Sequence, residues 1–435
     1  MESLNRFRGK SPSLFFLSIL ILVLLNGPNV VAQPVMNRDD QALVAGILNQ
    51  AYHDVKDYYY DPKLKGMDWD ARYKLYSGMA ARAHNLGEGY WIIAAFLNGL
   101  EDSHTFFVPP RHLTQYDSGF EYALIGDACF ITHVRSGTDA ARNVHVGDQI
   151  LKLDGYDVNV KDFHDVQYFF NYLVPQAEEK LVLRSPQGEV RDATVKAEVK
   201  VNGRAVGIDQ LVWERNERKL ETSAQLVERG DLAIWKIRMF DGSGEGFNKS
   251  LAAARRHKAI ILDLRGNPGG TEEALSSVVN ALFDHDIKMF DRVLRKSTKP
   301  MVVKHHGEAF QGKLIVLVDH GSASASELLA RVVQLEHRGT VIGDRTAGAV
   351  MESILHPELG ISNGERTIYG FSITEANLVM GDGNSLEKVG VIPDELLIPS
   401  AAGLAAGLDP VLSHAAELCG VKLDAVDAGK LFPAP

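Results

Sequence analysis

Two segments of the chain share one pattern: a short apolar run, a break of small and polar residues, and then an amphipathic run. The apolar runs, 259–262 and 313–318, contain several β-branched residues, which is typical of strands buried on both faces of an α/β sheet. Apolar residues then recur at helical spacing over 274–282 and 328–335. The pattern predicts two strand–turn–helix units in tandem. A further apolar run at 232–237 predicts the first clear strand of the same α/β region.

Before this region the pattern changes twice. Apolar residues recur at helical spacing over residues 40–100, which predicts helices. Short strand-like runs then predict a compact β-rich unit. The expected fold class is α/β, with a helical N-terminal region and an inserted β-rich domain. The expected parts are the N-terminal helical region (36–112), the β-rich unit (117–200), the α/β core (205–400) and a C-terminal helical tail (401–435).

The first 32 residues have the pattern of a secretory signal peptide. A basic start precedes an apolar core over 14–25, and small residues lead up to a predicted cleavage after Ala32. The apolar core is shorter than the roughly 20 residues that span a bilayer. We therefore expect a secreted or periplasmic protein that does not associate with the membrane after cleavage, with an uncleaved anchor as the alternative.

Charge and cysteine content narrow the possible functions. The formal net charge is −10, which disfavours nucleic acid and anionic membrane surfaces as partners. Cys129 and Cys419 are the only cysteines, so the chain is not a disulfide scaffold and has no cysteine-based metal site. We expect two free, buried thiols, with a single bridge as the alternative.

The break after the second strand carries the candidate chemistry. Ser322, Ser324 and Ser326 lie where the helix is predicted to begin. A hydroxyl at such a position meets unpaired backbone N–H groups and the positive end of the helix dipole, which are the donors that an oxyanion needs. In the first unit, the turn at Gly269 and Gly270 can present a second bare N–H toward this serine. The simpler interpretation is a serine that only caps the helix.

The two breaks together resemble a known family. Asp-Leu-Arg-Gly-Asn-Pro-Gly-Gly at 263–270 and Ser-Ala-Ser-Ala-Ser-Glu at 322–327 are similar to motifs of the C-terminal processing, or tail-specific, serine peptidases. The resemblance covers roughly the whole chain after residue 32. It implies a core like that of the ClpP and crotonase superfamily, with Ser324 as the nucleophile. It also implies cleavage of polypeptides through an acyl-enzyme, with cuts near C-termini as one option, and neither a metal nor an organic cofactor.

That family uses two kinds of base to activate the serine. In the Ser-Lys branch, a lysine lies 25 residues after the nucleophile and a glutamine follows four residues later. Here Ala349 and Ser353 occupy these positions, so a Ser-Lys dyad is excluded there. The tricorn-like members instead use a tetrad of Ser, His, Ser and Glu.

The residues that match the tetrad are Ser103, His104, Ser324 and Glu387, the last of which precedes a Gly-Val-Ile-Pro-Asp segment. The resemblance implies that His104 takes the proton from Ser324, while Ser103 and Glu387 orient the imidazole and stabilise its charged form. Taken singly, His104 is equally compatible with a helix C-cap and Glu387 with a solvated loop charge. The complete set favours the tetrad.

Two binding features complete the expectation. The amide N–H of Ala325 and one from Gly269 or Gly270 would form the oxyanion hole. The Gly-Asp-x-Ile-x-x-x-x-Gly pattern at 147–155 resembles a PDZ domain, which binds an extended peptide at a sheet edge. Gly119 and Phe120 would lie at its carboxylate-binding loop, although Glu121 is unfavourable there.

Two rival functions remain open. A secreted pseudo-peptidase would keep the fold and the PDZ-like unit as a peptide-binding module without hydrolysis, because fold does not guarantee activity. A crotonase-type acyl-CoA enzyme would use paired oxyanion turns. It would need neither a nucleophilic serine nor a PDZ-like unit, and we rank it last.

Overall fold

The computed structural model describes residues 36–110, 114–201, 224–241, 245–362 and 364–432. The predicted signal peptide lies outside these residues. Within them, no helix is both long and apolar enough to span a membrane.

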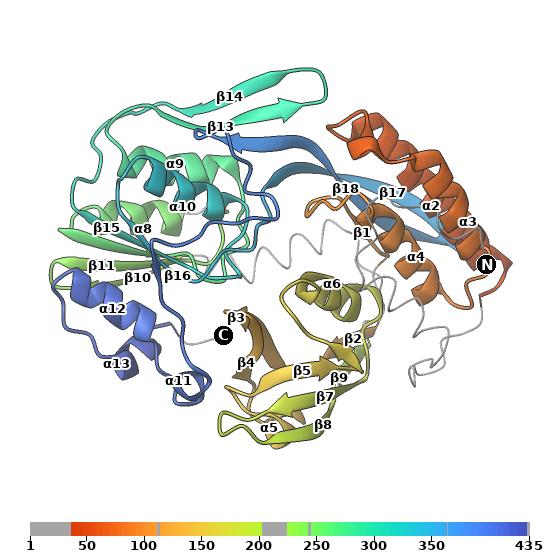
Figure 1. Cartoon of the computed structure of the whole chain (residues 1–435), viewed down its shortest axis with the longest axis horizontal. Helices are drawn as coiled ribbons and strands as arrows, with labels where there is room; N and C mark the ends of the chain where they lie inside the picture. Colours follow the sequence, from red (N-terminus) through yellow and green to blue (C-terminus); the bar gives the residue numbers. More distant parts are fainter. Residues whose placement is uncertain (1–35, 111–113, 202–223, 242–244, 363, 433–435) are drawn as a thin grey trace, which may run out of the picture.

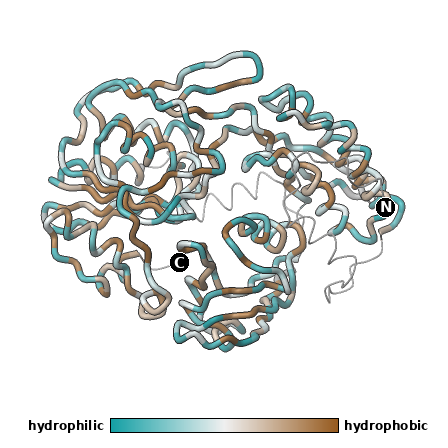
Figure 2. Tube along the Cα trace, in the orientation of Figure 1, coloured by the Kyte–Doolittle hydropathy of each residue, from teal (hydrophilic) through white to brown (hydrophobic). Residues whose placement is uncertain are grey.

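The α/β core is built on a six-stranded sheet that contains both predicted strand–turn–helix units. Its strands, in spatial order, are β10 (Ala224–Arg229), β11 (Leu232–Ile237), β12 (Ala259–Asp263), β15 (Lys313–Val318), β16 (Thr340–Gly343) and β19 (Glu395–Leu396). All neighbouring pairs are parallel except β10 with β11. The central strands are hydrophobic along their length (Figure 2), because helices cover both faces of the sheet.

Different parts of the chain supply these two helical layers. One face packs against α8 (Glu245–Ala254), α9 (Glu272–Leu282) and α10 (Ala325–Leu335). The other face packs against α12 (Pro410–Leu418) and α13 (Ala425–Gly429), and a short helix α11 (Ala401–Ala405) precedes them. The helical tail therefore forms part of the core, because Val411, Leu412, Ala415 and Ala416 bury their side chains against the sheet.

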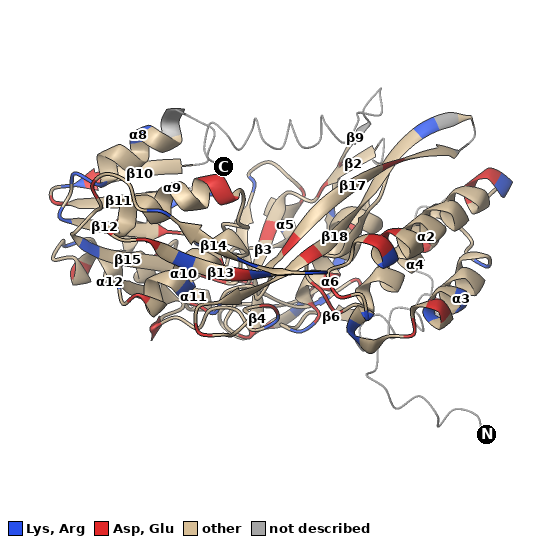
Figure 3. Cartoon of the chain, turned by 90° about the horizontal axis from the view of Figure 1, so that it is seen from above, with Lys and Arg blue, Asp and Glu red and all other residues tan. Residues whose placement is uncertain are grey.

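A second sheet connects the core to the N-terminal helices (Figures 1 and 3). It has the order β1-β18-β13-β14, and β17 also pairs with β18. Its strands are β1 (Phe106–Val108), β13 (Ile287–Leu294), β14 (Thr298–Val303), β17 (Met351–Ser362) and β18 (Glu365–Met380). Phe106 lies opposite Ser372 in the pairing of β1 with β18. This pairing fixes the segment just before β1, where His104 lies, against the long β18 strand.

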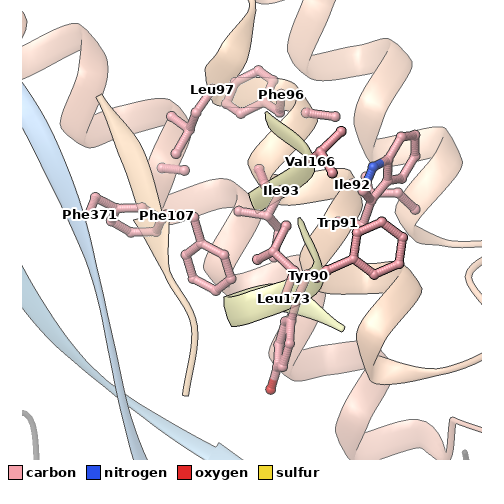
Figure 4. Close-up of a cluster of buried hydrophobic side chains, with 14 of the residues drawn as sticks. Tyr90, Trp91, Ile92, Ile93, Phe96, Leu97, Phe107, Val166, Leu173 and Phe371 are labelled. Carbon is pink, nitrogen blue, oxygen red and sulfur yellow. The ribbon is translucent and has the colours of Figure 1, made fainter. Parts of the chain in front are cut away.

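The predicted N-terminal helices are present, but they do not have a core of their own. They are α2 (Arg38–Tyr58), a 3₁₀ turn η1 (Leu64–Gly66), α3 (Trp69–Ala80) and α4 (Leu86–Asn98). Figure 4 shows side chains of α4 packed with Phe107 of β1, Phe371 of β18, and Val166 and Leu173 of the β-rich unit. The boundary near residue 112 therefore does not separate two hydrophobic cores.

The β-rich unit has a mainly antiparallel sheet of its own. Its elements are β3 (Phe120–Ile125), β4 (Ala128–Val134), α5 (Ala140–Asn143), β5 (Gln149–Leu153), β6 (Tyr156–Asp157), α6 (Phe163–Tyr168), η2 (Phe169–Leu173), β7 (Glu178–Arg184) and β8 (Val190–Lys196). The segments that enter and leave it pair as β2 (Thr114–Asp117) and β9 (Glu198–Val201). Arg135 contacts a carboxylate on each, Asp117 at 2.7 Å and Glu198 at 3.1 Å.

Both cysteines are free thiols. Cys129 is buried in the β-rich unit, as expected, whereas Cys419 at the end of α12 is only half-buried. Burial raises the pKa of the Cys129 thiol to about 12, which keeps it protonated and unreactive.

The position of Leu412 predicts a stability effect. Leu412→Ala leaves a cavity between α12 and the fully buried sheet, so we expect it to lower the free energy of unfolding by about 2–5 kcal/mol. Urea unfolding followed by tryptophan fluorescence measures this change. The matched control is Val426→Ala on α13, where the side chain is 49% exposed and the expected change is within about 0.5 kcal/mol. Equal effects of the two substitutions would contradict this packing.

Candidate active site

Ser324 lies at the start of α10 with an unusual backbone conformation. It is the N-cap residue, with φ 53° and ψ −115°, which is a strained conformation for a residue with a side chain. Its two serine neighbours are fully buried and already donate hydrogen bonds: Ser322 to the carbonyl of Leu264 at 2.9 Å and Ser326 to that of Asn267 at 3.0 Å. These bonds disfavour both neighbours as nucleophiles, so the geometry favours Ser324 among the three serines.

The first turn packs directly against Ser324. A Cβ added at Gly269 would lie 2.8 Å from the Ser324 Cβ, and one added at Gly270 would lie 2.1 Å from the Phe240 carbonyl oxygen. Both glycines also have positive φ values, 103° and 144°. Close backbone approach therefore requires glycine at both positions.

The structure distinguishes between the candidate oxyanion donors. Gly269 N–H donates to Asn267 Oδ1 at 2.8 Å, so Gly270 is the better candidate of the two glycines for the second donor. In the described part of the chain, the N–H groups of Ala325 and Gly270 make no hydrogen bond. Ala325 N lies 3.1 Å from the position of a Cβ on Gly269, so the two turns meet at this point.

The histidine lies in a second cluster just before β1. The Ser103 hydroxyl is 2.7 Å from His104 Nδ1 and donates to Glu387 Oε2 at 2.8 Å, while Ser103 N–H donates to Glu387 Oε1 at 2.8 Å. A hydroxyl has only one proton. Since Ser103 gives its proton to Glu387, His104 must donate from Nδ1 to Ser103, and this tautomer leaves Nε2 as a proton acceptor.

A short loop joins this cluster to the nucleophile turn. Val350 N–H donates to Glu387 Oε2 at 2.9 Å, and the carbonyl of Ala349 accepts from Ser324 N–H at 3.0 Å. Ser103, His104 and Glu387 are thus linked directly, and Ser324 is linked to them through residues 349–350. Among the described residues, Ser324 and His104 do not hydrogen-bond to each other, and such bonds often form only when substrate is bound.

The environment of His104 keeps it neutral near pH 7. Burial lowers the pKa of its imidazole, the carboxylates of Glu387 and Asp102 act in the opposite direction, and Lys388 adds to the decrease. A neutral imidazole with a free Nε2 is the form that a general base requires.

Glu327 was not among the predicted site residues, although it holds the nucleophile turn. Its fully buried carboxylate accepts from four donors at 2.6–3.0 Å: Ser324 N–H, Thr346 Oγ1–H, Gly348 N–H and Ala349 N–H. Burial raises the pKa of Glu327 to about 7 despite these bonds. Its place three residues after a helix N-cap serine is a sequence signal that could have identified it.

Gly119 and Phe120, which were predicted to bind a peptide carboxylate, lie at the start of β3. Gly119 N–H donates to Asp117 Oδ1 at 3.0 Å, and a Cβ added at Gly119 would lie 2.7 Å from the Thr138 Cβ. Phe120 is buried, with its ring near that of Tyr122. The Gly119 amide is therefore already hydrogen-bonded within its own turn, and its binding of a terminal carboxylate stays a prediction.

Within the described ranges, no group of three or more His, Cys, Asp and Glu residues is placed to hold a metal ion.

Comparisons with known proteins identify peptidases to which the chain is similar. Residues 231–397 match the model of peptidase family S41, and residues 40–88 match that of the tricorn protease C1 domain. The chain is 25% identical over 393 residues to the carboxyl-terminal-processing peptidase 3, chloroplastic, of Arabidopsis thaliana, covering 84% of this chain and 71% of that protein. It is 31% identical over 256 residues to a carboxyl-terminal-processing protease of Synechocystis, covering 58% and 54%.

A solved structure shows the same fold. The crystal structure of mature CPAF superposes with a TM-score of 0.63 at 16% identity, over 84% of this chain and 94% of that one. The S41 model falls on the core that holds both turns, and relatives named for C-terminal processing match most of the chain. Residues 231–397 therefore form a peptidase family S41 domain, and the comparisons support a serine peptidase.

Proposed function

We propose that the protein is an endopeptidase that cleaves polypeptides with Ser324 as nucleophile and His104 as general base. The observation that carries this proposal is the hydrogen-bonded chain from His104 through Ser103 to Glu387, which reaches Ser324 through Val350 and Ala349. The signal-like pattern of residues 1–32 supports action in a secretory or periplasmic compartment.

The reaction follows from the tautomer of His104. Nε2 takes the proton of the Ser324 hydroxyl as Oγ attacks the substrate carbonyl carbon, and the oxyanion accepts hydrogen bonds from Ala325 N–H and Gly270 N–H. The imidazolium then gives its proton to the leaving amine, which frees the amine product and leaves an ester on Ser324. Water hydrolyses this ester by the same steps, with His104 again acting as base and then as acid.

Ser103 and Glu387 act on the other side of the ring. When His104 is charged, its Nδ1–H still donates to Ser103, whose hydroxyl donates to Glu387. The carboxylate therefore stabilises the imidazolium without taking a proton from it.

The architecture of the rest of the chain extends the proposal. The core would be of the ClpP and crotonase type, and residues 117–200 would form a PDZ-like domain inserted between residues 36–112 and 205–400. β3 lies at the edge of its sheet, so an extended peptide can pair with its backbone there. Because the Gly119 amide is occupied, we expect binding by strand pairing rather than by capture of a terminal carboxylate.

The first prediction concerns the nucleophile. We expect Ser324→Ala to reduce cleavage of fluorescein-labelled casein by at least about 1,000-fold, because no other hydroxyl takes its place. The matched control is Ser326→Ala, which removes a buried hydroxyl bonded to the Asn267 carbonyl and should leave cleavage within about tenfold. Loss of cleavage in Ser326→Ala but not in Ser324→Ala would identify Ser326 as the nucleophile instead. A wild-type protein that binds casein without cleaving it would support the pseudo-peptidase.

The second prediction concerns pH. The base must be unprotonated, and the pKa of His104 lies below the usual 6.5 because the ring is largely removed from water. We therefore expect kcat/KM for a peptide substrate to fall on the acidic side with a midpoint below pH 6.5. A midpoint above 6.5 would contradict the proposed environment of His104.

The third prediction concerns the contact between the two turns. In Gly269→Ala the new methyl group pushes against the Ser324 Cβ, so we expect kcat/KM to fall by about 100-fold or more. Gly266→Ala is the matched control in the same turn: its φ of 70° is also positive, but no atom lies within 4 Å of the added Cβ. It should cost about 1–2 kcal/mol of stability and leave kcat/KM within about tenfold. Equal losses of activity would show that turn strain, and not the contact with Ser324, is responsible.

A further inference from the structure

Asp102 is a buried carboxylate two residues before His104. It is 6% exposed and accepts four hydrogen bonds. Oδ1 accepts from His104 N–H at 2.8 Å, Thr105 N–H at 3.1 Å and Thr374 Oγ1–H at 2.7 Å, and Oδ2 accepts from the Tyr59 hydroxyl at 2.9 Å.

These bonds attach the turn that carries His104 to two separate elements. Thr374 belongs to β18, and its N–H also donates to the Thr105 hydroxyl at 3.0 Å. Tyr59 is the C-cap residue of α2, and the next residue, Tyr60, donates its N–H to the Thr374 carbonyl at 2.9 Å. The position of the His104 backbone therefore depends on Asp102.

A side chain that accepts hydrogen bonds from the N–H groups of His104 and Thr105 does not need to be charged. An asparagine side chain would accept from His104 and Thr105 in the same way, and burying it would cost less free energy than burying a carboxylate. In the described residues, Asp102 has no Lys, Arg or His partner within ion-pair distance. The cation that forms near it during the proposed reaction is the imidazolium of His104.

We propose that Asp102 is a positioning residue that fixes the His104 backbone and whose charge, together with that of Glu387, stabilises the His104 imidazolium. The inference rests on the proposed function, in which that imidazolium forms. Asp102 is thus a second carboxylate beside His104. It bonds to the backbone N–H of His104, whereas Ser103 and Glu387 act at the imidazole Nδ1.

The electrostatic surroundings agree with this role. Glu387 and Asp102 both raise the pKa of His104 against the effects of burial and of Lys388. Tyr59 and Tyr60 lie near Asp102, and burial with the carboxylate charge raises the pKa of both phenols. The two tyrosines therefore stay protonated over the working pH range, and Tyr59 remains a neutral donor to Asp102.

The test is an NMR titration of the His104 imidazole in protein labelled with [13Cε1]histidine, carried out in the Ser324→Ala background and assigned with His104→Gln. Asp102→Asn keeps the shape and the N–H acceptor but removes the charge. We expect the titration midpoint of His104 to fall by roughly one pH unit. The titration is measured in a variant that lacks the proposed nucleophile, so its result does not depend on catalysis. The His104 midpoint can therefore be interpreted even if the hydrolysis assays contradict the proposed function.

Two control variants distinguish the effect of the Asp102 charge from the effect of its hydrogen bonds. Tyr59→Phe and Thr374→Val each remove a neutral donor to Asp102 but keep the carboxylate, so the midpoint should not fall in either. If Asp102→Asn does not fold, as judged by thermal melting, Asp102→Ser provides a second neutral acceptor and should show the same decrease. An unchanged midpoint in a folded neutral variant would overturn the inference and leave Asp102 a purely structural cap.

Discussion

The hydrogen bonds to Glu387 bring together three segments that are far apart in the sequence. Its carboxylate accepts from Ser103, which lies 284 positions earlier, and from Val350, which lies 37 positions earlier. The first contact attaches the histidine-bearing turn, and the second attaches the loop that binds the nucleophile turn through Ala349. Without Glu387 the two halves of the site would have no direct hydrogen-bonded connection through this loop. The second sheet serves the same purpose on a larger scale, because β18 pairs with β1 directly after the histidine.

Carboxylates recur as the means of fixing the backbone around the site. Glu327 ties the N–H of Ser324 to the loop at 346–349, and Asp319 accepts from the N–H groups of Gly266 and Gly321, one from each turn. Glu327 is fully buried and Asp319 partly buried, and each recovers part of the solvation that it loses from its N–H donors. Such groups can hold a strained residue like Ser324 in place, because the surrounding bonds over-determine its backbone.

The sequence predicted those parts of the molecule whose signal is local. Strands β12 and β15 are continuous apolar runs, and the helices that follow them have a clear helical period, so both units could be placed from the sequence. The β17–β18 hairpin was not predicted. Leu359 and Ile361 are about two-thirds exposed on it, so its residues do not alternate in the simple way that marks a half-buried strand.

The candidate site shows the same limit at finer scale. Residue types and motif spacing were enough to nominate Ser324, His104, Ser103 and Glu387, three of which the structure joins by hydrogen bonds. The direction of a single N–H was not predictable: the Gly269 amide turns toward Asn267 because that side chain folds back into the turn. Glu327 and Asp102 were missed because only some of their partners are local. The loop at 346–349 comes near Glu327, and Tyr59 and Thr374 near Asp102, only in the tertiary structure.

The central claim is that His104 activates Ser324, and covalent labelling with a fluorophosphonate tests it most directly. Intact mass and peptide mapping of the labelled protein would be compared between the wild type and His104→Ala. The account predicts one adduct, on the peptide that contains Ser324, and its loss in His104→Ala. An adduct on a different serine, labelling that persists without His104, or no labelling of the wild type would contradict it.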